Sequence, residues 1–167
     1  MSADTPEGPL AGTPEARLAA LGLVLPSLSE PRGAYVRARR EGSLLFIAGH
    51  GPAPDAAGRR PTGKVGADLT MEEGYDAARR AGLGILSTLK AELGQLSRVT
   101  AILRVLGFVN VAPGFSATPP VIDGCSDLLV AVFGEAIGRH TRTAIGVAML
   151  PYDLPVECEA VVAIRDD

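Results

Sequence analysis

The chain has 167 residues, of which 47% are hydrophobic and 21% are charged, and its formal net charge is −3. This length and composition are typical of one globular domain that buries its own core. The acidic balance argues against a nucleic-acid-binding protein, which needs a clustered basic face. No apolar run reaches the ~18 residues of a membrane span, and the acidic start is not a secretion signal, so we expect a cytoplasmic protein.

Residues 1–32 are predicted to be an N-terminal tail that contains one short helix. Proline, glycine and small polar residues dominate residues 1–12, as in a loose tail. Thr13 is a candidate N-cap with Pro14 in the first helical turn, and Gly22 can end the helix. Residues 33–167 are predicted to form a single domain.

The domain is predicted to begin with a β-hairpin. The first strand alternates from Tyr35, Glu41-Gly42 forms the turn, and residues 44–48 return as a buried strand. Residues 52–68 follow as a loop rich in proline and glycine. Loops of this length are often functional or form an interface.

The main helix is predicted over residues 70–94. Thr70 and Glu73 match a capping box, apolar residues recur at spacings of three and four from Tyr75 to Leu93, and Gly94 ends the helix. Its many small residues indicate close packing on a sheet.

The rest of the chain is predicted as strand, helix, strand, strand. Residues 99–111 read as a strand buried on both faces, and a second helix begins at Thr118 or Asp123 and ends near Gly134 or Gly138. The order β-β-α-β-α-β-β predicts an α+β layer, with helices on one face of a mixed sheet. The other face keeps apolar residues that the chain itself does not cover, which favours an oligomer; they are Ile145, Val147, Val161 and Ala163.

Four segments resemble those of a known family. They are Gly33-Ala-Tyr35, Leu45-Phe-Ile-Ala-Gly49, Arg142 to Pro151, and Val156-Glu-Cys-Glu-Ala160. The last two carry the most specific pattern, an arginine, seven residues, Leu-Pro and then a V-E-x-E-A strand. On these motifs the chain resembles the YjgF/RidA superfamily, also called the L-PSP endoribonuclease family, and several further segments resemble a distinct subgroup.

The resemblance implies a chorismate-mutase-like fold and a homotrimer with three clefts between subunits. The founding branch of the family hydrolyses 2-imino acids to 2-keto acids and ammonia, and it needs no metal or cofactor. In this sequence Arg142 matches the carboxylate-binding arginine, whose planar fork of donors suits bidentate binding. Glu157 matches the glutamate associated with the attacking water.

Other positions are carried over from the same resemblance. Tyr35 and Gly49 match positions that line the substrate site, and Ser126 stands where the family has an asparagine. His50 replaces a glutamine and is a candidate acid–base group, since histidine titrates near neutral pH. Ala48 and Ala144 replace a serine and a cysteine, so part of the polar surround of the site is gone.

The residues themselves leave other roles open. Arg142 alternatively forms a structural ion pair with Glu157 or Glu159 across neighbouring strands. His140 suits the end of a helix, where the helix dipole favours it. Cys125 and Cys158 are unpatterned and fit small core residues, and two histidines without a ligand cluster argue against a metal site.

Three functions remain as alternatives. The first is a RidA-like hydrolase of imines or enamines acting on a small carboxylate held by Arg142. The second is a trimer that binds such a carboxylate without turnover, which the lost serine and cysteine favour. The third, RNA cleavage, is suggested only by a name of the family, and the acidic chain lacks an aromatic and basic surface for it.

Overall fold

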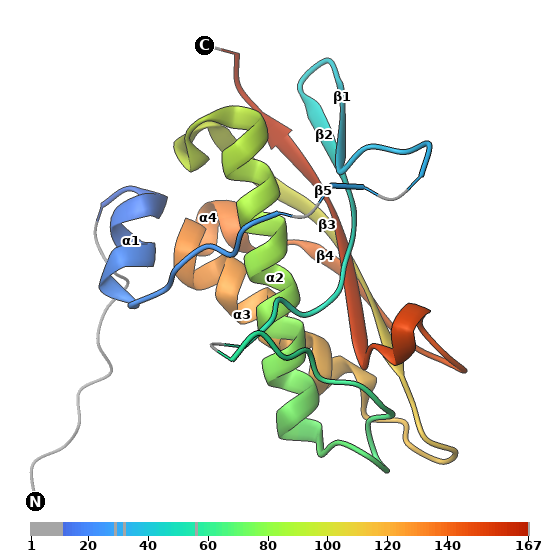
Figure 1. Ribbon diagram of the computed structural model, residues 1–167. Coiled ribbons are helices and arrows are strands. Elements are labelled where there is room, and N and C mark those ends of the chain that lie inside the picture. Colours follow the sequence, from blue (N-terminus) through green and yellow to red (C-terminus); the bar gives the residue numbers. More distant parts are fainter. Residues whose placement is uncertain (1–11, 29, 32, 56, 167) are drawn as a thin grey trace, which may run out of the picture.

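A five-stranded mixed sheet forms one layer of the molecule, and the helices cover one of its faces (Figure 1). The computed structural model describes residues 12–28, 30–31, 33–55 and 57–166, so the predicted loose tail over residues 1–12 lies outside the described residues except for its last residue. The strands lie in the order β1-β2-β5-β3-β4, and only β3 and β4 run parallel. Their bounds are Ala38–Glu41 (β1), Leu44–His50 (β2), Val99–Asn110 (β3), Thr141–Val147 (β4) and Val156–Ile164 (β5).

The helical layer consists mainly of two long helices, α2 and α3. The bounds of the helices are Pro14–Ala20 (α1), Met71–Leu93 (α2), Thr118–Phe133 (α3) and Glu135–Gly138 (α4). Single 3-10 turns lie over Leu96–Arg98 and Pro151–Asp153. After α1 the elements follow the predicted order β-β-α-β-α-β-β, which confirms the α+β layer with helices on one face. None of the helices in the described ranges has the length and the apolar content needed to cross a membrane.

Three details of the predicted elements were wrong or incomplete. The first strand begins at Ala38 rather than at Tyr35, whose side chain is 58% exposed in the segment before it. Both Gly134 and Gly138 mark helix ends, because α3 stops at Phe133 and the short α4 follows. Strand β3 is not buried on both faces along its whole length, since Leu103 is 39% exposed.

The ends of α1 and α2 follow their local sequence. Thr13 caps α1 by accepting the Ala16 N–H at 3.2 Å. Thr70 and Glu73 form the predicted capping box of α2, with each side chain accepting the other residue's backbone N–H at 3.1 and 2.8 Å. These bonds satisfy N–H groups that have no partner inside a helix.

Helix α1 packs against the helical layer, although it lies in the segment predicted as an N-terminal tail. Leu18 is buried in the core, and Glu15 accepts bonds from Lys90 Nζ at 3.0 Å and from the Leu96 N–H at 2.7 Å. The domain boundary at residue 33 stays a prediction.

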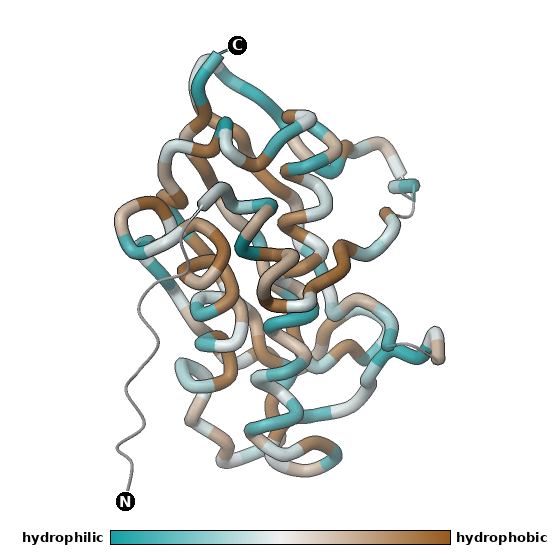
Figure 2. Tube along the Cα trace, turned by 90° about the vertical axis from the view of Figure 1, so that its left-hand side faces the viewer, coloured by the Kyte–Doolittle hydropathy of each residue, from teal (hydrophilic) through white to brown (hydrophobic). Residues whose placement is uncertain are grey.

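Glycines let α3 approach both its neighbours closely. A methyl group at Gly124 would lie 2.0 Å from the Tyr75 carbonyl oxygen of α2, and one at Gly107 would lie 2.5 Å from Ile122. Since such distances are far below van der Waals contact, only glycine allows this packing of α3 on α2 and on β3. Figure 2 shows hydrophobic stretches running through the centre of the molecule, between more hydrophilic outer segments.

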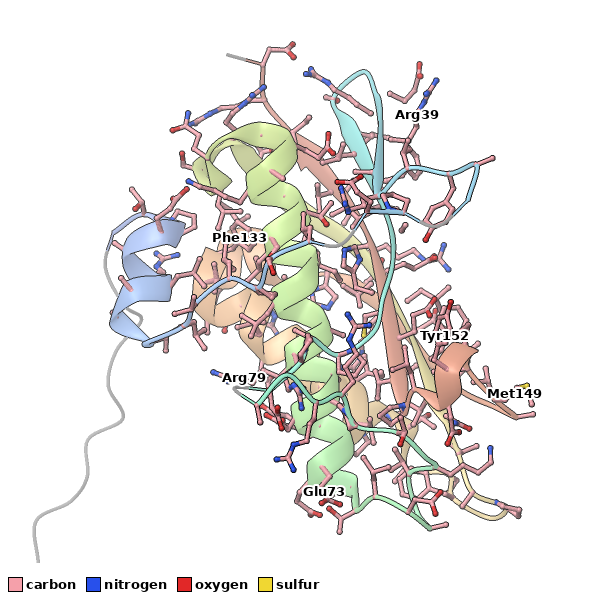
Figure 3. All side chains as sticks on the ribbon, viewed as in Figure 1. Arg39, Glu73, Arg79, Phe133, Met149 and Tyr152 are labelled. Atoms are coloured by element: carbon pink, nitrogen blue, oxygen red, sulfur yellow. The ribbon has the colours of Figure 1, made fainter. Side chains whose placement is uncertain are left out.

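The sheet face opposite the helices is open and carries exposed apolar side chains. Cross-strand pairing places Phe46 beside Val161, and Phe108 between Glu157 and Ile145. Phe46 is 45% exposed and Ile145 is 42% exposed. Met149 and Tyr152, at the end of this layer, also project away from the helices (Figure 3). The open face therefore exposes apolar side chains, with charged residues such as Glu157 and Glu159 between them.

Candidate functional site

Arg142 lies at the start of β4 and points to the helical layer, where α3 holds it. Its Nη1 donates to Asp123 Oδ1 at 2.6 Å and to Ser126 Oγ at 3.0 Å. Asp123 and Ser126 are one helical turn apart, so both face the strand. The alternative in which Arg142 pairs with Glu157 or Glu159 is therefore wrong.

His140 completes this cluster. Its Nδ1 lies 2.7 Å from the Gly138 carbonyl oxygen and its Nε2 lies 3.0 Å from Ser126 Oγ. A carbonyl only accepts, so Nδ1 carries the proton and the neutral ring accepts the Ser126 hydroxyl proton at Nε2. Burial, and then the positive charge of Arg142, lower the pKa of His140, while the bond to Gly138 opposes them. The imidazole is therefore neutral near pH 7.

Glu157 lies on the other face of the same sheet. Along β5 buried residues alternate with half-buried ones, and Glu157 is on the half-buried, open side. Burial, followed by the negative charge of Glu159, raises the pKa of the Glu157 carboxyl. Among the described residues no side chain or backbone group forms a hydrogen bond or ion pair with it. Arg142 and Glu157 therefore do not meet within a single chain.

Gly49 makes room for the Glu157 carboxylate. A methyl group at Gly49 would lie 2.1 Å from Glu157 Oε1, so a side chain at this position would displace the carboxylate. The two residues lie on neighbouring strands next to an irregularity in the pairing of β2 with β5 between Ile47 and His50. Of the residues predicted for the site, Gly49 and Glu157 are thus brought together on the open face.

His50 lies apart from Glu157, on the helix side of the sheet. Its Nδ1 is 2.7 Å from the Ala48 carbonyl oxygen and its Nε2 is 2.9 Å from Thr88 Oγ1 on α2. Burial lowers the pKa of His50, the nearby charge of Arg37 lowers it further, and the bond to Ala48 opposes both. Both ring nitrogens are engaged, and the catalytic role of His50 stays a prediction.

Tyr35 is exposed ahead of β1 and is not part of the Arg142 cluster. The two cysteines are free and buried, which confirms their reading as small core residues. A hydrogen bond from Cys125, and then burial, raise the pKa of the Cys158 thiol. In the described part of the chain no three His, Cys, Asp or Glu side chains gather closely enough to hold a metal ion.

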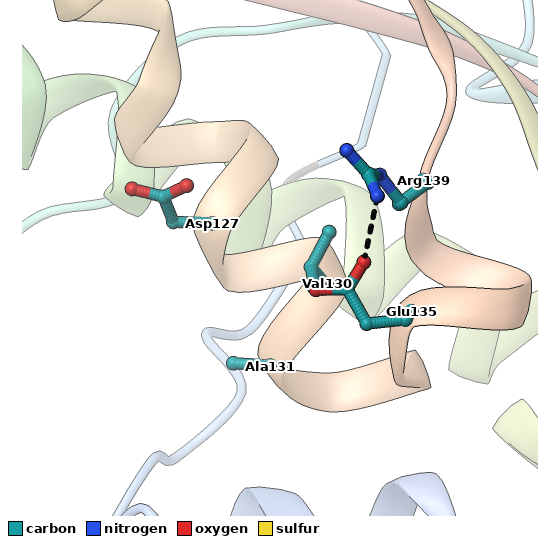
Figure 4. Close-up of a pocket in the computed structure, with 5 residues that line it drawn as sticks. All are labelled: Asp127, Val130, Ala131, Glu135 and Arg139. Atoms are coloured by element: carbon teal, nitrogen blue, oxygen red, sulfur yellow. Dashed lines mark ion pairs between the residues drawn. The ribbon is translucent and has the colours of Figure 1, made fainter. Parts of the chain in front are cut away.

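Two shallow hollows lie near these residues without containing them. One, of about 410 Å³, runs along α3 and α4, where Arg139 and Glu135 form an ion pair at 3.4 Å (Figure 4). The other, of about 250 Å³, lies on the open face beside Phe46 and Glu159. Neither Arg142 nor Glu157 lines either hollow.

The sequence pointed to Arg142 and Ser126 as candidate site residues, but not to Asp123 and His140, which the structure places beside them. Asp123 was considered only as a helix start, and His140 only as a residue suited to a helix end. A local signal existed for both. His140 is two residues before Arg142, which puts both on one side of an extended chain, and Asp123 is three residues before Ser126 on one helix.

Comparisons with known proteins agree on the family. The family model described as "YjgF/chorismate mutase-like, putative endoribonuclease" matches residues 15–159. Protein TCP17 of Trypanosoma cruzi is 41% identical over 155 residues, which are 93% of this chain and 96% of that protein.

Two similar crystal structures come from bacteria. A "putative endoribonuclease" of Shewanella oneidensis MR-1 is 37% identical, with a TM-score of 0.86 over 92% of this chain and all of that one. Atu1372 of Agrobacterium tumefaciens, a protein of unknown function, is also 37% identical, with a TM-score of 0.82 over 92% of this chain and 94% of that one. With a family match over most of its length and these close relatives, the chain belongs to the YjgF/RidA family.

Proposed function

We propose that this protein hydrolyses small 2-imino or enamine acids to 2-keto acids and ammonia, and that Arg142 holds the substrate carboxylate. The main observation that supports this proposal is the open edge of the Arg142 guanidinium. Within the described residues Nε and Nη2 have no hydrogen-bond partner, and the side chain is 23% exposed. Two parallel N–H groups on one edge are the geometry that binds a carboxylate bidentately.

Glu157 is the proposed base for the attacking water. A useful general base has a pKa close to the working pH, and burial moves the pKa of Glu157 in that direction. Because no described group bonds to its carboxylate, its oxygens are free to accept a proton from water. This role rests on the match to the family pattern at Glu157.

In an assembly of several copies of the chain, Arg142 of one copy and Glu157 of another can contact the same substrate molecule. Arg142 faces the helices and Glu157 faces the open side of the sheet, so one small substrate cannot touch both in a single protomer. Strand β4 is an edge strand, and the exposed apolar side chains of the open face need cover. We therefore place the active site in a cleft between two protomers of a homotrimer, with Arg142 from one and Glu157 from the next.

The assembly can be tested by light scattering at micromolar concentration. We expect a mass of three times the chain mass of 17.2 kDa. Phe46→Glu should dissociate the trimer, because it puts a charge into the covered face. Val24→Glu is the matched control, since Val24 is 84% exposed and lies outside the sheet. A wild-type mass equal to one chain would contradict the trimer and the shared cleft.

Arg142→Lys tests the anchor. The lysine keeps the charge but loses the bidentate geometry, so we expect affinity for pyruvate and L-alanine to fall about 10- to 100-fold. Titration calorimetry measures both ligands, and Arg139→Lys is the control because Arg139 pairs only with Glu135 among the described residues. Equal affinities in wild type and Arg142→Lys would show that Arg142 is not the anchor.

Binding without turnover is the second candidate. Its support is the loss of two polar positions of the family, where Ala48 and Ala144 stand. Ammonia release separates the two functions, using imines generated in place by an amino-acid oxidase and comparing the rate with that in buffer. Acceleration by the protein supports the hydrolase. Ligand binding without acceleration, over small and bulky side chains, supports the binding trimer instead.

A further inference from the structure

Asp123 occupies one end of the proposed carboxylate anchor. The two hydrogens of Arg142 Nη1 are both used, one by Asp123 Oδ1 and one by Ser126 Oγ. The edge formed by Nε and Nη2 is left for a ligand. Asp123 in turn uses only Oδ1 within the described residues, and its side chain is 46% exposed. An open donor edge and an open carboxylate oxygen therefore belong to one ion pair.

The charge of this cluster is zero before any ligand binds. The positive charge of Arg142 is balanced by Asp123, and the Ser126 hydroxyl is neutral. His140 adds no charge near pH 7, because its pKa is lowered and Nε2 accepts from Ser126. A monoanion bound here leaves the cluster with one negative charge. A ligand that carries both charges leaves it neutral and satisfies Asp123 as well as Arg142.

We propose that Asp123 is a specificity-determining residue that selects zwitterionic ligands, with the ligand carboxylate on the open edge of Arg142 and its cationic nitrogen on Asp123. The inference rests on the proposed function and adds the charge class of the substrate. A 2-iminium carboxylate has this charge pattern and so does an α-amino acid. A 2-keto acid lacks the cationic nitrogen.

This selection distinguishes substrate from product. Hydrolysis converts R–C(=NH₂⁺)–COO⁻ and H₂O into R–CO–COO⁻ and NH₄⁺: water adds to the carbon, the C–N bond breaks, and the nitrogen leaves with both protons of the water. The positive charge departs with ammonium. The keto acid left behind carries only a negative charge, and the Arg142–Asp123 pair has no net charge to balance it. The negative charge of Asp123 therefore favours release of the keto acid.

The test compares two matched ligand pairs, L-alanine with pyruvate and glycine with glyoxylate, by titration calorimetry at pH 7. We expect wild type to bind each amino acid at least about tenfold more tightly than its keto acid, the range of one charged hydrogen bond. Asp123→Asn should reverse the order, because the cluster then carries one positive charge. Asp127→Asn is the control, since Asp127 lies one turn along α3 and bonds to Tyr75 Oη.

Several outcomes overturn the inference. It fails when wild type binds pyruvate as tightly as L-alanine, or when Asp123→Asn leaves their ratio unchanged. The proposed function then still stands, provided that Arg142→Lys weakens the binding of both ligands. Wild type that binds neither the amino acids nor the keto acids overturns the inference and the carboxylate anchor together. A thermal melt of each variant confirms that a changed ratio comes from a folded protein.

Discussion

Glu157→Gln is expected to lower the rate of imine hydrolysis by about 10²–10⁴-fold, the usual contribution of a general base. Glutamine keeps the shape of the side chain but cannot take a proton from water. Because Glu157 makes no hydrogen bond within the described residues, the change should leave folding intact. The measurement is ammonia release under substrate saturation. An unchanged kcat would remove Glu157 from the mechanism.

The pH dependence of this rate gives an independent check. The carboxyl must be ionised to act as a base, so activity should be lost as pH falls through its pKa. Because burial and Glu159 raise that pKa, the loss should occur at a higher pH than for an ordinary glutamate. Glu159→Gln is the matched variant: it should keep kcat on the plateau and move the midpoint to lower pH.

Gly124→Ala is expected to destabilise the fold by roughly 3 kcal/mol or more, the upper range for overpacked cores. The added methyl group would lie 2.0 Å from the Tyr75 carbonyl oxygen and 3.0 Å from the Arg79 backbone nitrogen. Both are backbone atoms, so α2 and α3 have to separate before the methyl group fits. Urea unfolding followed by circular dichroism measures the change.

Gly82→Ala provides the comparison at the same helix crossing. Its methyl group would meet the end of the Leu128 side chain at 2.9 Å and Cys125 Sγ at 3.3 Å, which are side-chain atoms. Leu128 can change rotamer, and alanine is favoured over glycine in a helix by about 1 kcal/mol. Gly82→Ala should therefore cost much less than Gly124→Ala. Equal losses of unfolding free energy in the two variants would show that the contact with backbone atoms is not the cause of the destabilisation by Gly124→Ala.

The order of the elements was predictable because most of them carry local signals. The capping box at Thr70, the apolar stripe of α2 and the alternation of β5 depend on neighbouring residues only. The burial of β3 was not predictable in this way. A strand that is covered on one face can have the same apolar composition as a strand covered on both faces, and the difference depends on what packs against it.

The site was predictable only in part. The family pattern pointed to Arg142 and Glu157 as candidates, but it did not reveal that the two lie on opposite faces of the sheet. That relation depends on strand pairing, since Arg142 is opposite Val105 and Glu157 is opposite Phe108. The pairing of Arg142 with Asp123 likewise depends on how α3 crosses the sheet, which Gly107 and Gly124 determine through close contacts.

The position of β5 has a consequence for how the protein is made. The last strand in chain order lies in the middle of the sheet, between β2 and β3. A growing chain that has completed β2 at His50 must wait until residues 156–164 are translated before that strand gains its second neighbour. At typical translation rates this takes roughly 5–20 seconds, during which the edge of the hairpin stays unpaired. Slower translation prolongs the interval in which nascent chains can pair with one another.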